Sequence, residues 1–238
     1  LQMLPHLLTA SLRKTGETRT ACILVATSGD TGKAALDGFH DVPGTKIIVY
    51  YPVDGVSPMQ KLQMATQEGA NVEVIAIHGN FDDAQTGVKK IFSAVSKDQL
   101  LEGKGVRLSS ANSINIGRLV PQIVYYVYAY ATLVHDGKIE DGQEINVVVP
   151  TGNFGNILAA FYAKQMGLPI HKLICASNEN KVLFDFFQTG VYDRNREFVL
   201  TSSPSMDILI SSYLERLIYT IAGQDAEKNA ELMAQLKE

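Results

Sequence analysis

The sequence predicts an α/β protein built from open, mostly parallel sheets with helices on both faces. Short apolar, β-branched runs alternate along the chain with stretches of helical periodicity. Continuous apolar runs of this kind are typical of parallel strands that are buried on both faces. The composition, with 46% hydrophobic and 19% charged residues and a formal net charge of −4, is that of an ordinary globular protein. A length of 238 residues allows one or two domains.

The individual elements follow from residue type and spacing. Apolar runs predict strands at 21–26, 46–51, 72–77, 106–108, 145–149, 173–176 and 198–200. Helical periodicity predicts helices at 82–95, 116–134, 156–166, 181–188, 205–221 and 225–237, and a stripe of leucines predicts another at the N-terminus. One further helix has a clear start signal, with Ser57 as N-cap and Pro58 at its first position, and Gly69 is expected just past its end.

Composition also argues against several classes of partner. The sequence pI near 5.8 gives no reason to expect nucleic acid or an anionic membrane. No apolar run reaches the roughly 20 residues of a membrane span. Cys22 and Cys175 lie in apolar runs, which indicates buried free thiols in a reducing compartment, and we expect a cytoplasmic protein. The five histidines lack metal-site spacing, so we expect no metal.

Two glycine-bearing turns each join a predicted strand to a helix. The first loop (27–32) follows the strand at 21–26, and the second loop (151–156) follows the strand at 145–149. Backbone N–H groups converge at a helix N-terminus, where the helix dipole favours negative charge, so each loop could hold a phosphate or a carboxylate. Neither loop has the Walker A or Rossmann spacing. The alternative is that the glycines only allow the chain to turn tightly.

A third cluster of polar residues precedes the helix at 116–134. Serines and asparagines fill 109–115, and Arg118 follows three residues later. An arginine is well suited to a bidentate grip on a phosphate, although N-capping beside a surface arginine would give the same pattern. No Gly-x-Ser-x-Gly motif or distinctive acid pair accompanies the three segments. Anion binding without a protein nucleophile is typical of enzymes whose cofactor performs the difficult step.

These segments resemble threonine synthase, the pyridoxal 5′-phosphate (PLP) enzyme that converts O-phosphohomoserine and water into threonine and phosphate in threonine biosynthesis. TSGDTG (27–32), SANSINIGR (110–118) and PTGNFGN (150–156) resemble the bacterial and fungal branch of that family. The resemblance implies two domains of the tryptophan synthase β-like PLP fold. The smaller α/β domain would span 20–115, and 1–19 with 116–238 would form an incomplete part of the larger, PLP-binding domain.

The resemblance also implies roles for individual residues. The second loop would cradle the cofactor's phosphate, and the carboxylate at position 30 would meet O3′ of its ring. The residues that would bind the cofactor are Gly152, Asn153, Phe154, Gly155, Asn156 and Asp30. The first loop would meet the substrate carboxylate, and the third segment would hold the phosphate of O-phosphohomoserine. The residues that would bind the substrate are Ser28, Gly29, Thr31, Ser113 and Arg118.

The resemblance places the catalytic lysine outside this sequence. The family's Schiff-base lysine lies in a Phe-Lys-Asp segment shortly before the helix that begins here at Leu1, and neither Lys14 nor Lys33 has that context. We therefore expect an internal fragment of a longer enzyme, inactive by itself. Another PLP enzyme of the same fold, such as a threonine dehydratase or cysteine synthase, fits 110–118 less well because those substrates carry no side-chain phosphate. A non-catalytic phosphate- or nucleotide-binding α/β domain is the remaining alternative.

Overall fold

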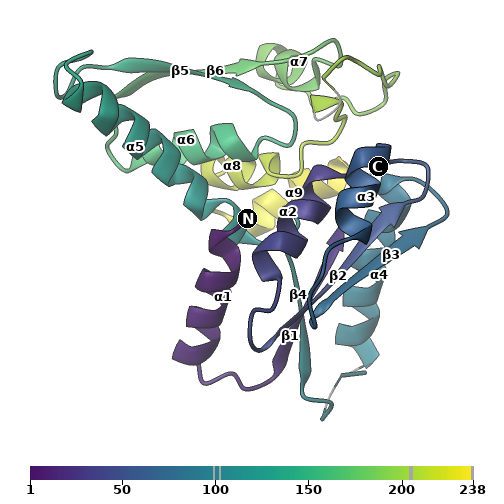
Figure 1. Cartoon of the computed structure of the whole chain (residues 1–238). Coiled ribbons are helices and arrows are strands. Elements are labelled where there is room, and N and C mark those ends of the chain that lie inside the picture. The colour runs from purple at the N-terminus through teal and green to yellow at the C-terminus, as the bar shows by residue number, and fades with distance from the viewer. Residues whose placement is uncertain (99, 102, 204–205, 237–238) are drawn as a thin grey trace. The chain divides into compact units, whose positions relative to one another are not determined.

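The structure, a computed structural model, describes residues 1–98, 100–101, 103–203 and 206–236. The chain divides into two compact units, Leu1–Arg118 and Leu119–Glu238, and each has its own parallel sheet (Figure 1). Every strand pair in both sheets is parallel. The predicted α/β class is therefore confirmed.

The first unit carries a four-stranded sheet in the order β3-β2-β1-β4. Its elements are α1 (Met3–Lys14), β1 (Thr20–Ala26), α2 (Asp30–Phe39), β2 (Thr45–Pro52), α3 (Pro58–Ala65), β3 (Val72–Ile77), α4 (Phe81–Asp98), β4 (Val106–Ser110) and the short 3-10 helix η1 (Ile116–Arg118). Because β1 pairs with both β2 and β4, it lies inside the sheet, and the first loop leaves from its carboxyl end.

Alternating side chains of β1 build two cores, one on each face of the sheet. Ile23 belongs to a cluster with Leu36 and Phe39 of α2. Leu24 belongs to the opposite cluster, with Val88 of α4. Leu4 of α1 joins the α2 side, which explains the leucine stripe at the N-terminus. This sheet is thus covered by helices on both faces, as the apolar run of β1 predicts.

The second unit is built around a two-stranded sheet. Its elements are α5 (Val120–His135), β5 (Ile145–Pro150), α6 (Gly155–Gln165), β6 (Ile170–Ala176), α7 (Val182–Thr189), α8 (Leu214–Ile221) and α9 (Ala226–Gln235). Val149 packs in a core with Leu158 of α6 and Leu183 of α7. On the other face Val148 is 59% and Ile174 43% exposed. Within the described residues, helices therefore cover one face of this sheet.

The predicted strands from 21–26 to 173–176 are all present, with ends that differ by up to three residues. The strand predicted at 198–200 is wrong. The side chain of Asn180 accepts from the N–H of Val199 and donates to its carbonyl oxygen, at 3.0 and 2.9 Å. Since both backbone groups of Val199 are already bonded, they are not available to a strand partner.

The helix predicted at 205–221 forms only from Leu214, and 206–213 is irregular. The backbone there is held by other partners: Tyr213 N–H donates to the Asn153 carbonyl oxygen at 3.1 Å, and Ser211 N–H donates to Tyr192 Oη at 2.8 Å. Residues 205 and 237, at the ends of two predicted helices, lie outside the described residues. Helix α3 begins at Pro58 as predicted but ends at Ala65, before Gly69.

Candidate functional site

The first loop folds around the side chain of Thr27. This side chain is 1% exposed, and its Oγ1 accepts from the N–H groups of Gly29 and Gly32, both at 2.9 Å. Gly29 is the N-cap of α2 and has φ 139°, a conformation that L side chains rarely adopt. Two N–H groups of the loop are therefore used in hydrogen bonds that stabilise the loop itself.

The remaining N–H groups of the first loop belong to Ser28, Asp30 and Thr31. Among the described residues, none of the three donates to a protein acceptor. Ser28 and Asp30 are exposed and Thr31 is half-buried. These groups stand at the N-terminus of α2, where backbone donors and the helix dipole favour an anion. This part of the loop can accept a carboxylate or phosphate.

Gln60 packs against the first loop from α3. Its Nε2 donates to Asp30 Oδ1 at 2.7 Å, and its Oε1 accepts from the Ser57 N–H at 3.0 Å. The Ser57 hydroxyl in turn accepts from the Gln60 N–H, which completes a capping box. A Cβ on Gly29 would lie 2.4 Å from Gln60 Cδ, so the amide occupies the space above that glycine. Sequence reasoning found the Ser57 cap and missed Gln60, although Ser-x-x-Gln is a recognisable signal.

Asn112 connects the third segment to the end of β1. Its side chain donates to the Ala26 carbonyl oxygen at 2.8 Å and accepts from the Ala26 N–H at 3.0 Å. The hydroxyl of Ser110 donates to the Leu24 carbonyl oxygen at 2.8 Å. These side chains continue the β1–β4 pairing beyond the last paired backbone, and so bring the third segment next to the first loop.

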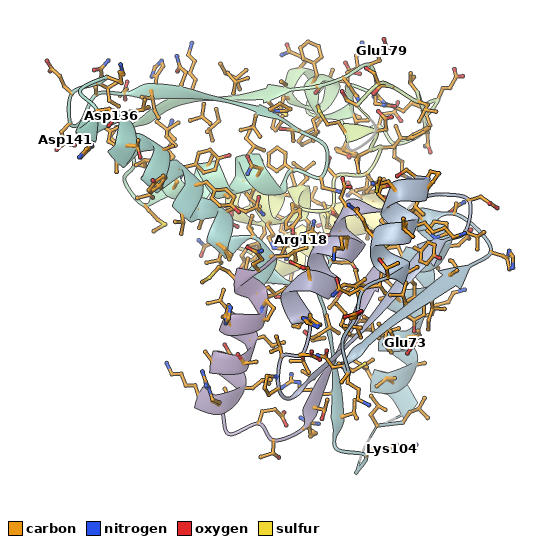
Figure 2. The ribbon with its side chains drawn as sticks, in the orientation of Figure 1. Glu73, Lys104, Arg118, Asp136, Asp141 and Glu179 are labelled. Atoms are coloured by element: carbon orange, nitrogen blue, oxygen red, sulfur yellow. The ribbon has the colours of Figure 1, made fainter. Side chains whose placement is uncertain are left out.

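Arg118 reaches the first loop from the end of η1, and Figure 2 shows it beside α2. Its Nη2 donates to Thr31 Oγ1 at 3.1 Å, and its Nη1 donates to the Ala111 carbonyl oxygen at 3.3 Å. Arg118 and Ser113, in the loop before η1, are both half-buried. The first unit therefore places Arg118 at the N-terminus of α2, although 87 residues separate it from Thr31.

The second loop joins β5 to α6 through a left-handed residue. Phe154 is the N-cap of α6 with φ 70°, and it is 5% exposed. Its ring packs against Phe187, with 6.0 Å between the ring centroids. A non-glycine residue in this conformation costs on the order of 1 kcal/mol, which burial of the ring offsets. The chain thus retains a large side chain where glycine would be the conformationally easier residue.

The N–H groups of the second loop are open at the start of α6. The N-cap of α6 makes no side-chain hydrogen bond, and no protein acceptor for the N–H groups of 152–156 lies among the described residues. The Asn156 side chain is tied to α5, where it accepts from Tyr126 Oη and donates to Gln122 Oε1. The backbone of this loop, more than its side chains, is therefore suited to a phosphate.

Residues 211–213, which we call the backing segment, lie against the second loop. Ser211 Oγ donates to the Gly152 carbonyl oxygen at 2.5 Å, and Tyr213 N–H donates to the Asn153 carbonyl oxygen at 3.1 Å. A Cβ on Gly155 would lie 3.0 Å from the Tyr213 ring, so this ring is one reason for glycine at 155. The backing segment lies 59 residues downstream and has no local sequence signal that would have revealed it.

Two cavities have linings that are less suited to binding an anion. One of about 330 Å³ in the second unit has a largely apolar lining that includes Phe154 and Cys175. One of about 420 Å³ in the first unit contains Arg19 and Arg107, but both contact Glu17, at 2.7 and 3.1 Å. Hydrogen bonding from Arg19 lowers the pKa of Glu17 to about 2. Both guanidinium groups are therefore already paired with a carboxylate.

Clusters of side chains that could hold a metal ion and helices that could cross a membrane are both absent from the described part of the chain. No three histidine, cysteine, aspartate or glutamate side chains gather there in a way that could hold a metal ion. None of the helices described is long and apolar enough to cross a membrane. Burial raises the pKa values of the free thiols of Cys22 and Cys175, which makes them weaker nucleophiles.

Comparison with known sequences places the chain in a family. No family model matches it. The chain is 42% identical to threonine synthase of Pseudomonas aeruginosa over 237 residues, which are 100% of this chain and 48% of that protein. It is 40% identical to threonine synthase of Saccharomyces cerevisiae, over 92% of this chain and 41% of that protein. The chain belongs to the threonine synthase family.

Other threonine synthase relatives and solved structures agree with this assignment. Human threonine synthase-like 1 is 46% identical over all of this chain and 32% of its own length. The structure of PLP-bound threonine synthase from Brucella melitensis matches with a TM-score of 0.85 and 42% identity, over 100% of this chain and 48% of that one. The structure of yeast threonine synthase matches with a TM-score of 0.79 and 37% identity, over 98% of this chain and 45% of that one. The chain thus spans between about a third and a half of these relatives.

Proposed function

We propose that this chain is part of a PLP-dependent threonine synthase, which converts O-phosphohomoserine and water into threonine and phosphate. The observation that carries the proposal is the second loop, whose open N–H groups at the start of α6 are suited to a phosphate. The match to a PLP-bound threonine synthase supports the same cofactor. The protein would act on a small molecule in the cytoplasm.

The residues of the second loop fit the phosphate of PLP. The N–H groups of Gly152, Asn153, Phe154, Gly155 and Asn156 would hold it, since they donate to no protein acceptor among the described residues. Asp30 would face O3′ of the ring, held by Gln60 from α3. When bound, PLP would store electrons while protons leave Cα and Cβ of the substrate, the phosphate leaves Cγ and water adds at Cβ. The protein's part is to hold and orient both phosphates and the carboxylate.

The first unit would bind the substrate. Ser28 and Thr31 would offer hydroxyls and N–H groups to the substrate carboxylate. The N–H of Gly29 already donates to Thr27 Oγ1, so Gly29 would contribute through its backbone conformation and not as a donor. Arg118 and Ser113 would hold the phosphate of O-phosphohomoserine. A guanidinium suits a phosphate monoester because its donors match two oxygens at once.

The whole protein would supply what this chain does not contain. We propose that the Schiff-base lysine comes from a segment preceding Leu1 in the longer protein, so that this chain alone does not turn over substrate. In the whole protein, 20–115 would form the smaller domain, and 1–19 with 116–238 would belong to the larger one. In this chain by itself, α1 packs within the first unit through Leu4.

Full-length protein, purified with PLP, tests the proposal. We expect phosphate release from O-phosphohomoserine, and we expect borohydride to fix PLP to a lysine that lies outside this chain. The chain alone should release no phosphate. Trapping on a lysine of this chain, together with turnover, would refute the placement of the catalytic lysine. Activity on threonine or O-acetylserine instead would favour another PLP enzyme, and a thermal shift with ATP but not PLP would favour a nucleotide-binding domain.

A further inference from the structure

The backing segment holds two consecutive carbonyl groups of the second loop. The Ser211 hydroxyl donates to the Gly152 oxygen, and the Tyr213 N–H donates to the Asn153 oxygen. Ser211 and Tyr213 are 6% and 3% exposed. The donor side of each bond is therefore buried, whereas Gly152 is half-buried and Asn153 is exposed.

Each of these bonds fixes the direction of an N–H group as well as a carbonyl. In a planar trans peptide, the C=O of one residue and the N–H of the next point in opposite directions. Holding the Gly152 oxygen therefore turns the Asn153 N–H away from the backing segment, and holding the Asn153 oxygen does the same for the Phe154 N–H. Both N–H groups belong to the set that donates to no protein acceptor among the described residues.

We infer that Ser211 is a positioning residue for a phosphate monoester bound at the second loop, and that it acts by orienting the Asn153 N–H. This inference rests on the proposed function of that loop. Ser211 does not touch the phosphate. Ser211 orients the Asn153 N–H before the phosphate binds, so the free energy of binding is not reduced by the entropy of ordering that peptide.

Tyr192 holds the backing segment in place from behind. Its hydroxyl donates to the Leu209 carbonyl oxygen at 2.9 Å and accepts from the Ser211 N–H at 2.8 Å. Its ring packs edge-on against Phe186 of α7, with 5.6 Å between the centroids. The position of the Ser211 hydroxyl is thus fixed by the core of the second unit, which distinguishes it from a mobile surface serine.

The experiment compares Ser211→Ala with Thr220→Val in the full-length protein. Both variants remove one hydroxyl that donates to a backbone carbonyl oxygen in the second unit. The acceptor of Thr220 Oγ1 is the Arg216 carbonyl oxygen, within α8 and outside the second loop, so Thr220→Val is the control. Affinities for PLP and for pyridoxal, which lacks the phosphate, are measured by fluorescence titration. We expect Ser211→Ala to lose roughly three- to tenfold in affinity for PLP and to keep its affinity for pyridoxal. Thr220→Val should keep both affinities, and Ser211→Thr should restore PLP binding.

A second readout follows the donor itself. Amide hydrogen exchange of Asn153, with inorganic phosphate as the probe ligand, should be faster in Ser211→Ala than in the wild type. If the wild type binds PLP and Ser211→Ala binds it equally well, the inference fails and the proposed function survives. Equal losses for PLP and pyridoxal would show a structural role only and would also overturn the inference. If the wild type binds neither PLP nor phosphate, the proposed function fails first.

Discussion

Gln60 Nε2 lies 2.7 Å from Asp30 Oδ1 and donates to it, which joins α3 to the first turn of α2. The same side chain closes the capping box at the start of α3 through its Oε1. One amide therefore stabilises a helix end and holds the carboxylate that we assign to the cofactor ring. The capping role and the contact with Asp30 can be separated by substituting glutamate for Gln60, because glutamate also completes a capping box.

Gln60→Glu should weaken PLP binding without unfolding α3. The glutamate keeps the cap but places a second carboxylate beside Asp30, where the wild type has a donor. We expect roughly a tenfold or greater loss of PLP affinity in the full-length enzyme, measured by titration, since a hydrogen bond to a charged group is lost and like charges face each other. In Asp30→Asn/Gln60→Glu the donor and acceptor are exchanged, so PLP affinity should recover in part relative to Gln60→Glu. Additive effects of the two substitutions would refute a direct contact.

Arg118→Lys should act on the substrate and spare the cofactor. The lysine keeps the positive charge but loses the fork that reaches both Thr31 and Ala111. Loss of a charged hydrogen bond costs about 1.5 to 3 kcal/mol, so kcat/KM for O-phosphohomoserine should fall by roughly 10- to 100-fold. PLP affinity, measured by titration, should change little. Similar losses for both ligands would instead indicate that Arg118 only supports the fold.

Local signals in the sequence predicted most of the fold and part of the candidate site. The run at β1 and the Ser57-Pro58 start of α3 depend on neighbours in the chain, so they could be read from residue type alone. The bonds from Ser211 to Gly152 and from Asn112 to Ala26 join residues 59 and 86 positions apart. The short apolar run around Val199 was misread because a distant side chain, Asn180, satisfies its backbone. Such contacts depend on tertiary packing and leave no periodic pattern.

Gly32→Ala should destabilise the first unit. A Cβ on this buried glycine would lie 2.6 Å from Thr27 Cγ2 and 2.7 Å from Met64 Sδ, so the core must shift. Overpacking of this kind typically costs about 1 to 3 kcal/mol. Gly87→Ala in α4 is the matched control, because nothing lies within 4 Å of its Cβ position, and it should stabilise by up to about 1 kcal/mol. Urea unfolding measures the free energy of unfolding of both variants and of the wild type. Equal values for Gly32→Ala and Gly87→Ala would contradict the close packing around Gly32.

Asp207 should make its segment sensitive to acid. Burial opposes ionisation of Asp207, but hydrogen bonds from Thr201 and Asn178 outweigh it and lower the pKa. Because the folded pKa lies below the unfolded value of about 4, the stabilisation is present above that pH and is lost as the pH falls through the folded pKa. Limited proteolysis near 199–203 should therefore quicken in that range.

Asp207→Asn provides the comparison. The carboxylate of Asp207 accepts hydrogen bonds from Thr201 and Asn178 through both of its oxygens. In the asparagine variant an NH₂ group replaces one of these oxygens, so a donor would face a donor and a hydrogen bond would be lost. The variant should be cleaved faster than the wild type at pH 7, and the difference should vanish in acid. Asp141→Asn, at an exposed position before β5, should behave like the wild type at every pH. A difference that persists in acid would exclude ionised Asp207 as its source.

The position of β1 between β2 and β4 sets an order of assembly during synthesis. β2 follows β1 closely, whereas the β4 partner of Thr20 is Val106. One edge of the apolar strand β1 must therefore stay unpaired in a nascent chain until more than 80 further residues have been made, and unpaired edges of this kind invite aggregation. The first loop gains the Asn112 contact to Ala26 only when that edge closes. On the ribosome, the substrate-binding end of the sheet would thus be the last part of the first unit to mature.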